Sequence, residues 1–279
     1  MKKFFIIILG TVLLSSCTHE FNQVLKTPDV AFRYEYAKEC YASGKFQRAA
    51  TLLEDLIVEL KGTDNAQESL YMLGMALFQS RDYENASKTF KKYATSYPRG
   101  YYADEANFYV GLSLFMSTPE PRLDQSQTVL AISALQQYLD LFPDARNKTQ
   151  AQDRLFELQD KLVKKELYSA QLYYDLGGYF GNINSNDESN YEACIVTAQN
   201  ALKEYPYTNL REKFALLIMK SKFELAENSV QARQLERYQD AEDECYGFIN
   251  EYPDSKEVKT AEKYIAVCKK HTSVKKEED

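Results

Sequence analysis

The sequence predicts an all-α protein assembled from stacked helix pairs, and two observations support this fold class. Glycine (10 residues) and proline (7 residues) are scarce in a chain of 279 residues, whereas an all-β sandwich or barrel needs many turns and therefore many such residues. Short motifs also recur at fixed offsets along the chain, which is typical of repeat proteins. We therefore expect long helices joined by short loops, in the order set out below.

Residues 1–16 have the pattern of a secretory signal peptide. Lys2 and Lys3 form a short positive region, and an apolar run of eleven residues follows from Phe4 to Leu14. A membrane-spanning helix needs about 20 apolar residues, so this run is too short to cross a bilayer. We expect it to direct export and then to be removed.

The end of this segment, Leu14-Ser15-Ser16-Cys17, resembles the bacterial lipobox. The resemblance implies cleavage before Cys17 and lipidation of its thiol, and several acyl chains anchor a protein stably without a spanning helix. An ordinary signal peptide with an incidental cysteine is the alternative. Thr18 stands where an aspartate would favour retention in the inner membrane, so we expect the outer membrane. Residues 17–28 then form a lipidated tether.

Two motifs recur at an offset of 37 residues. GKFQRA at 44–49 recurs as RDYENA at 81–86, and each precedes an apolar helical stretch. Gly74 and Gly111 hold equivalent places in two similar segments upstream, again 37 residues apart. A third signature is an aromatic residue followed by proline, which occurs at Tyr97-Pro98, Phe142-Pro143, Tyr205-Pro206 and Tyr252-Pro253.

These motifs resemble the tetratricopeptide repeat, a helix pair of about 34 residues. In such a pair a small residue in the first helix, here Gly74 or Gly111, lets the second helix approach closely. Proline ends the second helix because it lacks an amide donor and clashes with the preceding turn. The alanines expected where the two helices cross are Ala49, Ala86, Ala131 and Ala241.

The resemblance implies an α-solenoid of five tetratricopeptide-like pairs with a C-terminal capping helix over residues 29–270. We expect a loop insertion at 117–127, a helical lead-in at 148–165, and longer segments between helices near 177–190 and 227–237. Residues 271–279 should form a charged, disordered tail. The repeats are expected at about 29–62, 66–99, 103–144, 166–208 and 210–254, and the cap at 255–270.

Composition argues against several functions. The formal net charge of -7 leaves no basic face for nucleic acid. The two histidines, His19 and His271, lie near the ends of the chain, so we expect neither a catalytic triad nor a histidine-rich zinc site within the fold. No metal or small-molecule cofactor is suggested, and we expect no enzyme.

Four further cysteines, besides Cys17, lie among apolar helical positions. An exported chain can form disulfides, but no pairing follows from the sequence. We expect buried free thiols at Cys40, Cys194, Cys245 and Cys268.

A lipoprotein with these repeats resembles the BamD family of outer-membrane protein assembly lipoproteins. Beyond the alanines and prolines, the resemblance rests on YVGLS at 109–113, YPYT at 205–208 and the pattern Glu-Leu-x-x-Ala-x-x-Tyr-Tyr at 166–174. It covers nearly the whole mature chain. It implies a non-catalytic scaffold on the periplasmic face of the outer membrane, which docks to the BamA-type insertase and receives unfolded β-barrel precursors.

The resemblance also implies where partners bind: substrate at the N-terminal repeats and insertase at the C-terminal repeats. The first helices of the early repeats would present Tyr36, Cys40, Tyr71, Leu77 and Phe78 to an extended substrate, although these side chains could instead be core between repeats.

For the insertase, Thr197 stands where enterobacterial members of the family have an arginine. A salt bridge made by that arginine cannot form here, so the interface must differ in detail. Lys203 and Arg211 could supply charge nearby.

Other functions stay open at the level of sequence. A generic periplasmic tetratricopeptide adaptor for envelope or division machinery would share the repeats. A glycan-binding outer-membrane lipoprotein would be expected to carry tryptophan platforms for sugars, and the chain has no tryptophan. A lytic transglycosylase needs a compact lysozyme-like domain, and no stretch outside the repeats is long enough for one.

Overall fold

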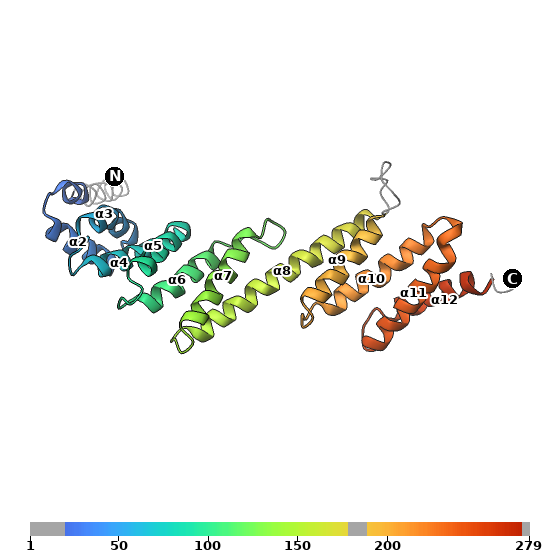
Figure 1. The fold of residues 1–279 in the computed structure, drawn as a ribbon. Coiled ribbons are helices and arrows are strands. Elements are labelled where there is room, and N and C mark those ends of the chain that lie inside the picture. The colour runs from blue at the N-terminus through green and yellow to red at the C-terminus, as the bar shows by residue number, and fades with distance from the viewer. Residues whose placement is uncertain (1–19, 178–188, 275–279) are drawn as a thin grey trace, which may run out of the picture. The chain divides into compact units, whose positions relative to one another are not determined.

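The computed structural model describes residues 20–177 and 189–274 (Figure 1). Throughout these ranges the regular secondary structure is α-helical, which confirms the predicted all-α class. The signal peptide at 1–16 and the lipidation site Cys17 lie outside the described residues, as do most of the 177–190 segment and residues 275–279.

The chain divides into two compact units, and one helix runs from the first into the second. The shared helix is α8 (Lys148–Leu176), in which residues up to Leu158 belong to the first unit. The other helices of the first unit are α2 (Val30–Ala42), α3 (Phe46–Glu59), α4 (Ala66–Gln79), α5 (Tyr83–Ser96), α6 (Ala103–Met116) and α7 (Ser126–Leu141). Those of the second unit are α9 (Asn190–Glu204), α10 (Arg211–Glu227), α11 (Gln231–Glu251) and α12 (Val258–Val274).

Within each unit, every helix packs against the next helix along the chain, from α2 to α7 and from α9 to α12 (Figure 1). This nearest-neighbour order is the arrangement of an α-solenoid. The pairs are α2/α3, α4/α5, α6/α7, the C-terminal half of α8 with α9, and α10/α11, with α12 after the last pair. We call the first helix of each pair the A helix and the second the B helix.

The glycines and alanines predicted at the helix crossings are tightly packed. A β-carbon on Gly74 would lie 2.6 Å from Cε1 of Phe90, and one on Gly111 would lie 2.6 Å from Cδ2 of Leu135. In both cases the facing side chain comes from the B helix of the same pair. The crossing alanines are completely buried at Ala49, Ala86, Ala131 and Ala241.

The aromatic–proline pairs end four of the B helices as predicted. The residue after the last helical position has φ between -120° and -133° and ψ between 62° and 67° in each case. A following proline disfavours the helical region for the residue before it, which explains this shared geometry. The four residues are Tyr97, Phe142, Tyr205 and Tyr252.

The helical lead-in expected at 148–165 is present, and as α8 it continues without a break into the first helix of the fourth repeat, since neither glycine nor proline interrupts it. Three other details of the sequence prediction need correction. The segment expected at 227–237 shortens to residues 228–230, since α11 already begins at Gln231. His271 is not in a disordered tail: it is helical, and its ring stacks on Tyr238 with centroids 4.2 Å apart.

The third correction concerns the tether. Residues 20–26 are helical, and Val24 is buried in the core that α2–α5 form. Phe21 and Leu25 pack against the same core, and the guanidinium of Arg48 lies 5.3 Å from the ring of Phe21. The folded part of the first unit therefore begins close after Cys17.

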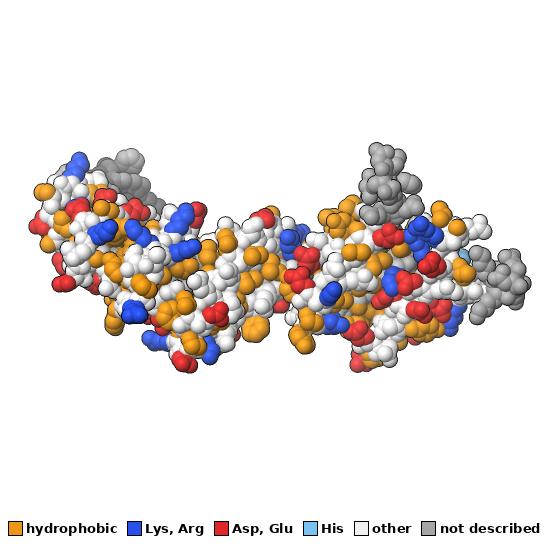
Figure 2. Space-filling view, viewed as in Figure 1, with side chains coloured by type: hydrophobic (Ala, Val, Ile, Leu, Met, Phe, Trp, Pro, Cys, Tyr) orange, Lys and Arg blue, Asp and Glu red, His pale blue; other side chains and the backbone are white. Residues whose placement is uncertain are grey.

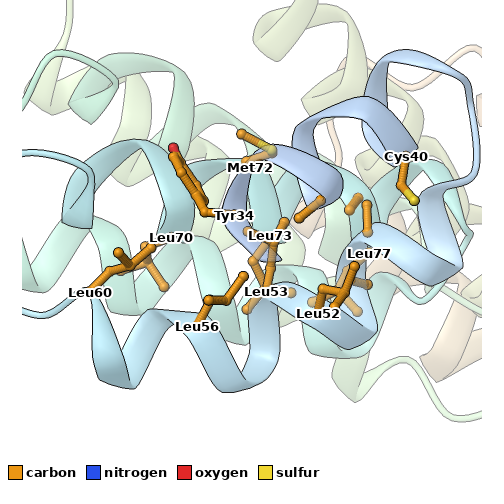
Figure 3. Close-up of a cluster of buried hydrophobic side chains, with 14 of the residues drawn as sticks. Tyr34, Cys40, Leu52, Leu53, Leu56, Leu60, Leu70, Met72, Leu73 and Leu77 are labelled. Atoms are coloured by element: carbon orange, nitrogen blue, oxygen red, sulfur yellow. The ribbon is translucent and has the colours of Figure 1, made fainter. Parts of the chain in front are cut away.

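Leucine is the most frequent residue in the core that α2–α5 form (Figure 3). Leucines of α3 and α4 pack around Tyr34 and Cys40, which come from α2. None of the helices in the described ranges is long and apolar enough to cross a membrane.

The four cysteines are buried free thiols, as expected: Cys40, Cys194, Cys245 and Cys268. Burial raises the pKa of Cys245 to about 12 and that of Cys268 to about 11. A thiol that stays protonated is a poor nucleophile, so these cysteines serve packing rather than chemistry.

The glycine at the A/B crossing should tolerate no side chain. Phe90 is fully buried and stacks on Tyr109 with centroids 5.2 Å apart, so its ring cannot move away from a new β-carbon. Gly74→Ala should therefore lower the free energy of unfolding by about 1–2 kcal/mol in a urea titration followed by circular dichroism.

Gly247→Ala is the matched control, because nothing lies within 4 Å of a β-carbon on this glycine, which lies within α11 about one turn before its end. It should raise the free energy of unfolding by about 0.5–1 kcal/mol, since alanine favours the helix. Equal effects of the two substitutions would contradict the close approach at Gly74.

Candidate functional site

The candidate site is a group of tyrosines on and beneath the A helices of the first unit. We call it the tyrosine cluster, and its members are Tyr34, Tyr41, Tyr71, Tyr93, Tyr102 and Tyr109. Tyr71 is central: its ring stacks flat on Tyr102, with centroids 4.2 Å apart and an interplanar angle of 5°, and it lies 6.1 Å from Tyr93. Such stacked and edge-on contacts hold the rings in fixed positions.

Hydrogen bonds from tyrosines to carboxylates join successive A helices. Tyr34 Oη donates to Glu68 Oε2 at 2.9 Å, from α2 to α4, and Tyr71 Oη donates to Glu105 Oε2 at 2.6 Å, from α4 to α6. Donor and acceptor are 34 residues apart in both bonds. Because the acceptor is charged, each bond is stronger than one between neutral groups.

A third bond of this kind lies within the α6/α7 pair, where Tyr138 Oη donates to Asp104 Oδ1 at 2.9 Å. It joins a B helix to its own A helix. Burial and the neighbouring carboxylate together raise the pKa of Tyr34, Tyr71 and Tyr138 well above the ordinary value of 10. These tyrosines therefore remain neutral donors over the whole physiological pH range.

The structure brings the five predicted substrate residues together in the first unit but divides them into two classes. Cys40 and Leu77 are each only 3% exposed and belong to the core, so they have no surface with which to contact a substrate. Tyr36, Tyr71 and Phe78 are half-buried and pack against the same core. Only these three offer part of their rings to a partner.

The three residues predicted to contact the insertase lie in the second unit. Thr197 is half-buried on α9, and Lys203 is exposed in the last turn of the same helix. Arg211, at the start of α10, donates to the Pro206 carbonyl at 3.0 Å and to Glu251 Oε1 at 3.3 Å. The charge of Arg211 is therefore engaged within the unit, whereas Lys203 presents its ammonium group to solvent.

Sequence reasoning missed the residues that complete the tyrosine cluster, namely Tyr102, Tyr109, Glu68 and Glu105. A usable signal existed, because Tyr34 precedes Glu68 by the same 34 residues that separate Tyr71 from Glu105. Among the side chains that the structure describes, no group of three or more His, Cys, Asp or Glu residues could hold a metal ion.

Comparison with known proteins gives a family and one curated relative. The model of the YfiO family, described as an outer membrane lipoprotein, matches residues 28–222, which is most of the chain. A relative from Aquifex aeolicus (strain VF5), named "Putative outer membrane protein assembly factor BamD", is 25% identical over 185 residues. That match covers 61% of this chain and 56% of the relative, so the chain spans about half the length of the relative.

A solved structure of the TPR2AB domain of yeast Sti1, described as a pHSP90 complex, is 11% identical to this chain. The superposition covers 86% of this chain and 98% of that one, with a TM-score of 0.35.

The bond between Tyr71 and Glu105 should stabilise the first unit in a pH-dependent way. Tyr71→Phe should lower the free energy of unfolding at pH 7 by about 1–2 kcal/mol, because it leaves a half-buried carboxylate without its donor. In the natural protein, unfolded Tyr71 would ionise near its ordinary pKa of 10 while the folded form keeps its proton, so stability falls as pH rises above 10. Urea titrations at several pH values above 10 should show that the free energy of unfolding falls less steeply with pH for Tyr71→Phe than for the natural protein.

Tyr207→Phe is the control, because Tyr207 is 98% exposed. It should change neither the stability at pH 7 nor its decline at alkaline pH. If Tyr71→Phe behaved like this control, the bond would contribute nothing to the fold.

Proposed function

The chain belongs to the YfiO family of outer membrane lipoproteins, and from this premise we propose that it is a scaffold of β-barrel assembly. In this role it docks to a BamA-type insertase and receives unfolded outer-membrane protein precursors at the periplasmic face of the outer membrane. The name of the Aquifex relative, an assembly factor, supports the same role. The prediction that the chain is not an enzyme is confirmed by its membership of this lipoprotein family.

The tyrosine cluster is the observation that supports substrate binding. An unfolded barrel segment is an extended chain that offers aromatic side chains and unpaired backbone N–H groups. The half-buried rings of Tyr71 and Tyr102 can stack with such side chains. Glu68 and Glu105 each accept a hydrogen bond from a tyrosine hydroxyl through Oε2. The Oε1 atom of each carboxylate could accept a further hydrogen bond from a backbone N–H of the substrate.

The exposed charge of Lys203 supports an insertase contact in the second unit. A lysine at the end of α9 also lies favourably at the negative end of the helix dipole. Its ammonium group could pair with a carboxylate of the insertase without breaking an existing bond. Arg211 would first have to leave Glu251, so Lys203 is the stronger candidate.

Affinity capture tests the proposed role directly. A tagged full-length lipoprotein, recovered from detergent-solubilised outer membranes, should bring down a BamA-type insertase as the main co-purifying chain. Lys203→Glu should lower that recovery several-fold, because it replaces attraction by repulsion at the contact. Lys61→Glu, a charge reversal at an exposed lysine of the first unit, should leave the recovery unchanged.

Recovery of only a glycan transporter or of division proteins would reject assembly as the function. Full recovery with both charge-reversal variants would leave the scaffold intact but remove Lys203 from the interface.

Membrane attachment has its own test at Cys17. Cys17→Ala removes the thiol that would accept the lipid, so the protein should move from the membrane fraction to the soluble fraction after cell lysis. Cys194→Ser, at a buried cysteine of the second unit, is the control. This variant protein should stay in the membrane fraction. Persistent membrane association of Cys17→Ala would count against the lipid anchor.

A further inference from the structure

A second surface lies on the B-helix side of the first unit, where a groove of about 680 Å³ runs between α5 and α7 with α6 as its floor. The groove uses Asn107, Val110 and Leu114 of α6. The tyrosine cluster instead uses Tyr102 and Tyr109, with Glu105 beside them, so the two surfaces take different stripes of the same helix.

Small side chains create the space. Where α5 and α7 face each other across α6, they carry Ser87 and Ala94 on one side and Ser133 and Ala134 on the other. The floor residues Val110 and Leu114 are too short to fill the gap between the two B helices. A volume of this size is within the range of clefts that bind ligands.

The groove is apolar inside and at one edge. Val110 and Leu114 are half-buried on its floor. On α7, Leu130 is 52% exposed and Leu141 is 56% exposed, and both line the groove. Large apolar side chains that gather around a concavity mark an interaction site more often than single exposed ones do.

The charged residues that line the groove are basic. Lys88 and Lys91 of α5 are the charged residues that line the groove, and no carboxylate does. Lys88 pairs with Glu84 at 2.7 Å, whereas Lys91 forms no ion pair with any residue that the structure describes. Figure 2 shows basic side chains over α5 and apolar ones over α6 and α7 on one face. In a chain of net charge -7, this edge favours an acidic occupant.

Polar side chains on α7 indicate the conformation of the occupant. Ser133 and Gln137 lie one turn apart, are exposed, and make no hydrogen bond to described parts of the chain. An extended segment has backbone N–H and C=O groups to offer them, whereas a helix satisfies its own. From Leu130 to Leu141 the groove is about 16 Å long, which matches about five extended residues.

We propose that this groove binds an extended acidic segment of a partner protein, about five residues long, in which leucine-like side chains alternate with carboxylates. Successive side chains of an extended chain point to opposite sides. One set therefore enters the apolar floor, and the other lies at the edge near Lys88 and Lys91. The proposal is independent of the scaffold role, since it uses no residue of the tyrosine cluster and none of the second unit.

The test uses the full-length lipoprotein in detergent and a fluorescein-labelled peptide, Leu-Glu-Leu-Asp-Leu, with fluorescence anisotropy as the readout. Binding should be saturable at about 0.15 M salt, where the screening length is about 8 Å and distant charges contribute little. The peptide Leu-Lys-Leu-Lys-Leu should bind at least about tenfold more weakly, because Lys88 and Lys91 would repel it.

Two matched pairs of variants locate the site. Lys91→Glu should weaken binding about fivefold, while Lys92→Glu, the same charge change at an exposed neighbour outside the groove, should have little effect. Ser133→Phe should fill the groove and abolish binding, while Gln136→Phe, exposed on α7 but outside the groove, should not. Circular dichroism melts verify that the variants are folded. If Ser133→Phe does not fold, the comparison of Lys91→Glu with Lys92→Glu tests the proposal.

Lack of saturable binding would overturn the proposal. So would equal effects of the two lysine variants, or unchanged binding to a folded Ser133→Phe. Tyr71→Phe and Lys203→Glu should bind the peptide normally, so failure of the scaffold role and failure of this groove can be told apart.

Discussion

A single helix pair cannot bury its apolar surface by itself, and this constraint shapes the whole chain. Each pair depends on the next one for its core, so the contacts between pairs must be as specific as those within them. Tyr34 to Glu68 and Tyr71 to Glu105 provide this specificity, because each bond can form only when neighbouring A helices are in the correct register. The tyrosine rings supply apolar area while their hydroxyl groups fix the alignment. The side chains that hold the repeats together are therefore also those that approach the A-helix surface.

The local rules of the repeat could be predicted from the sequence because they depend on single residues. Proline ends the helix that precedes it, and Gly74 permits a close approach that a β-carbon would block. What could not be predicted depends on packing. Leu77 is an apolar residue that could either contact a partner or belong to the core, and in the structure it is buried in the core. The periodicity of apolar residues does not distinguish these two roles. The repeat pattern places a boundary at residue 166, but α8 continues through it because the chain contains no helix-breaking residue there.

The helical residues 20–26 change the expected relation between the folded chain and the membrane. Two residues, Thr18 and His19, separate Cys17 from Glu20, and the three residue steps between them span about 11 Å at most. With Val24 buried in the core of the first unit, a lipid on Cys17 would hold this unit within a short distance of the leaflet. A scaffold that hands barrel segments to an insertase in the same membrane would gain from this arrangement, because its substrate surface would stay close to the site of insertion.

The first unit carries two surfaces of opposite character. The tyrosine cluster combines aromatic rings with the carboxylates Glu68 and Glu105, whereas the α5/α7 groove combines leucines with Lys88 and Lys91. If both surfaces bind as proposed, a segment suited to one would be disfavoured at the other by charge, so the two would select different partners. Both share α6, and Gly111 packs this helix directly onto α7 through Leu135. Because tight packing resists gradual deformation, α6 cannot shift at one of these surfaces without also displacing its contact with α7, so the same close packing fixes the geometry of both surfaces.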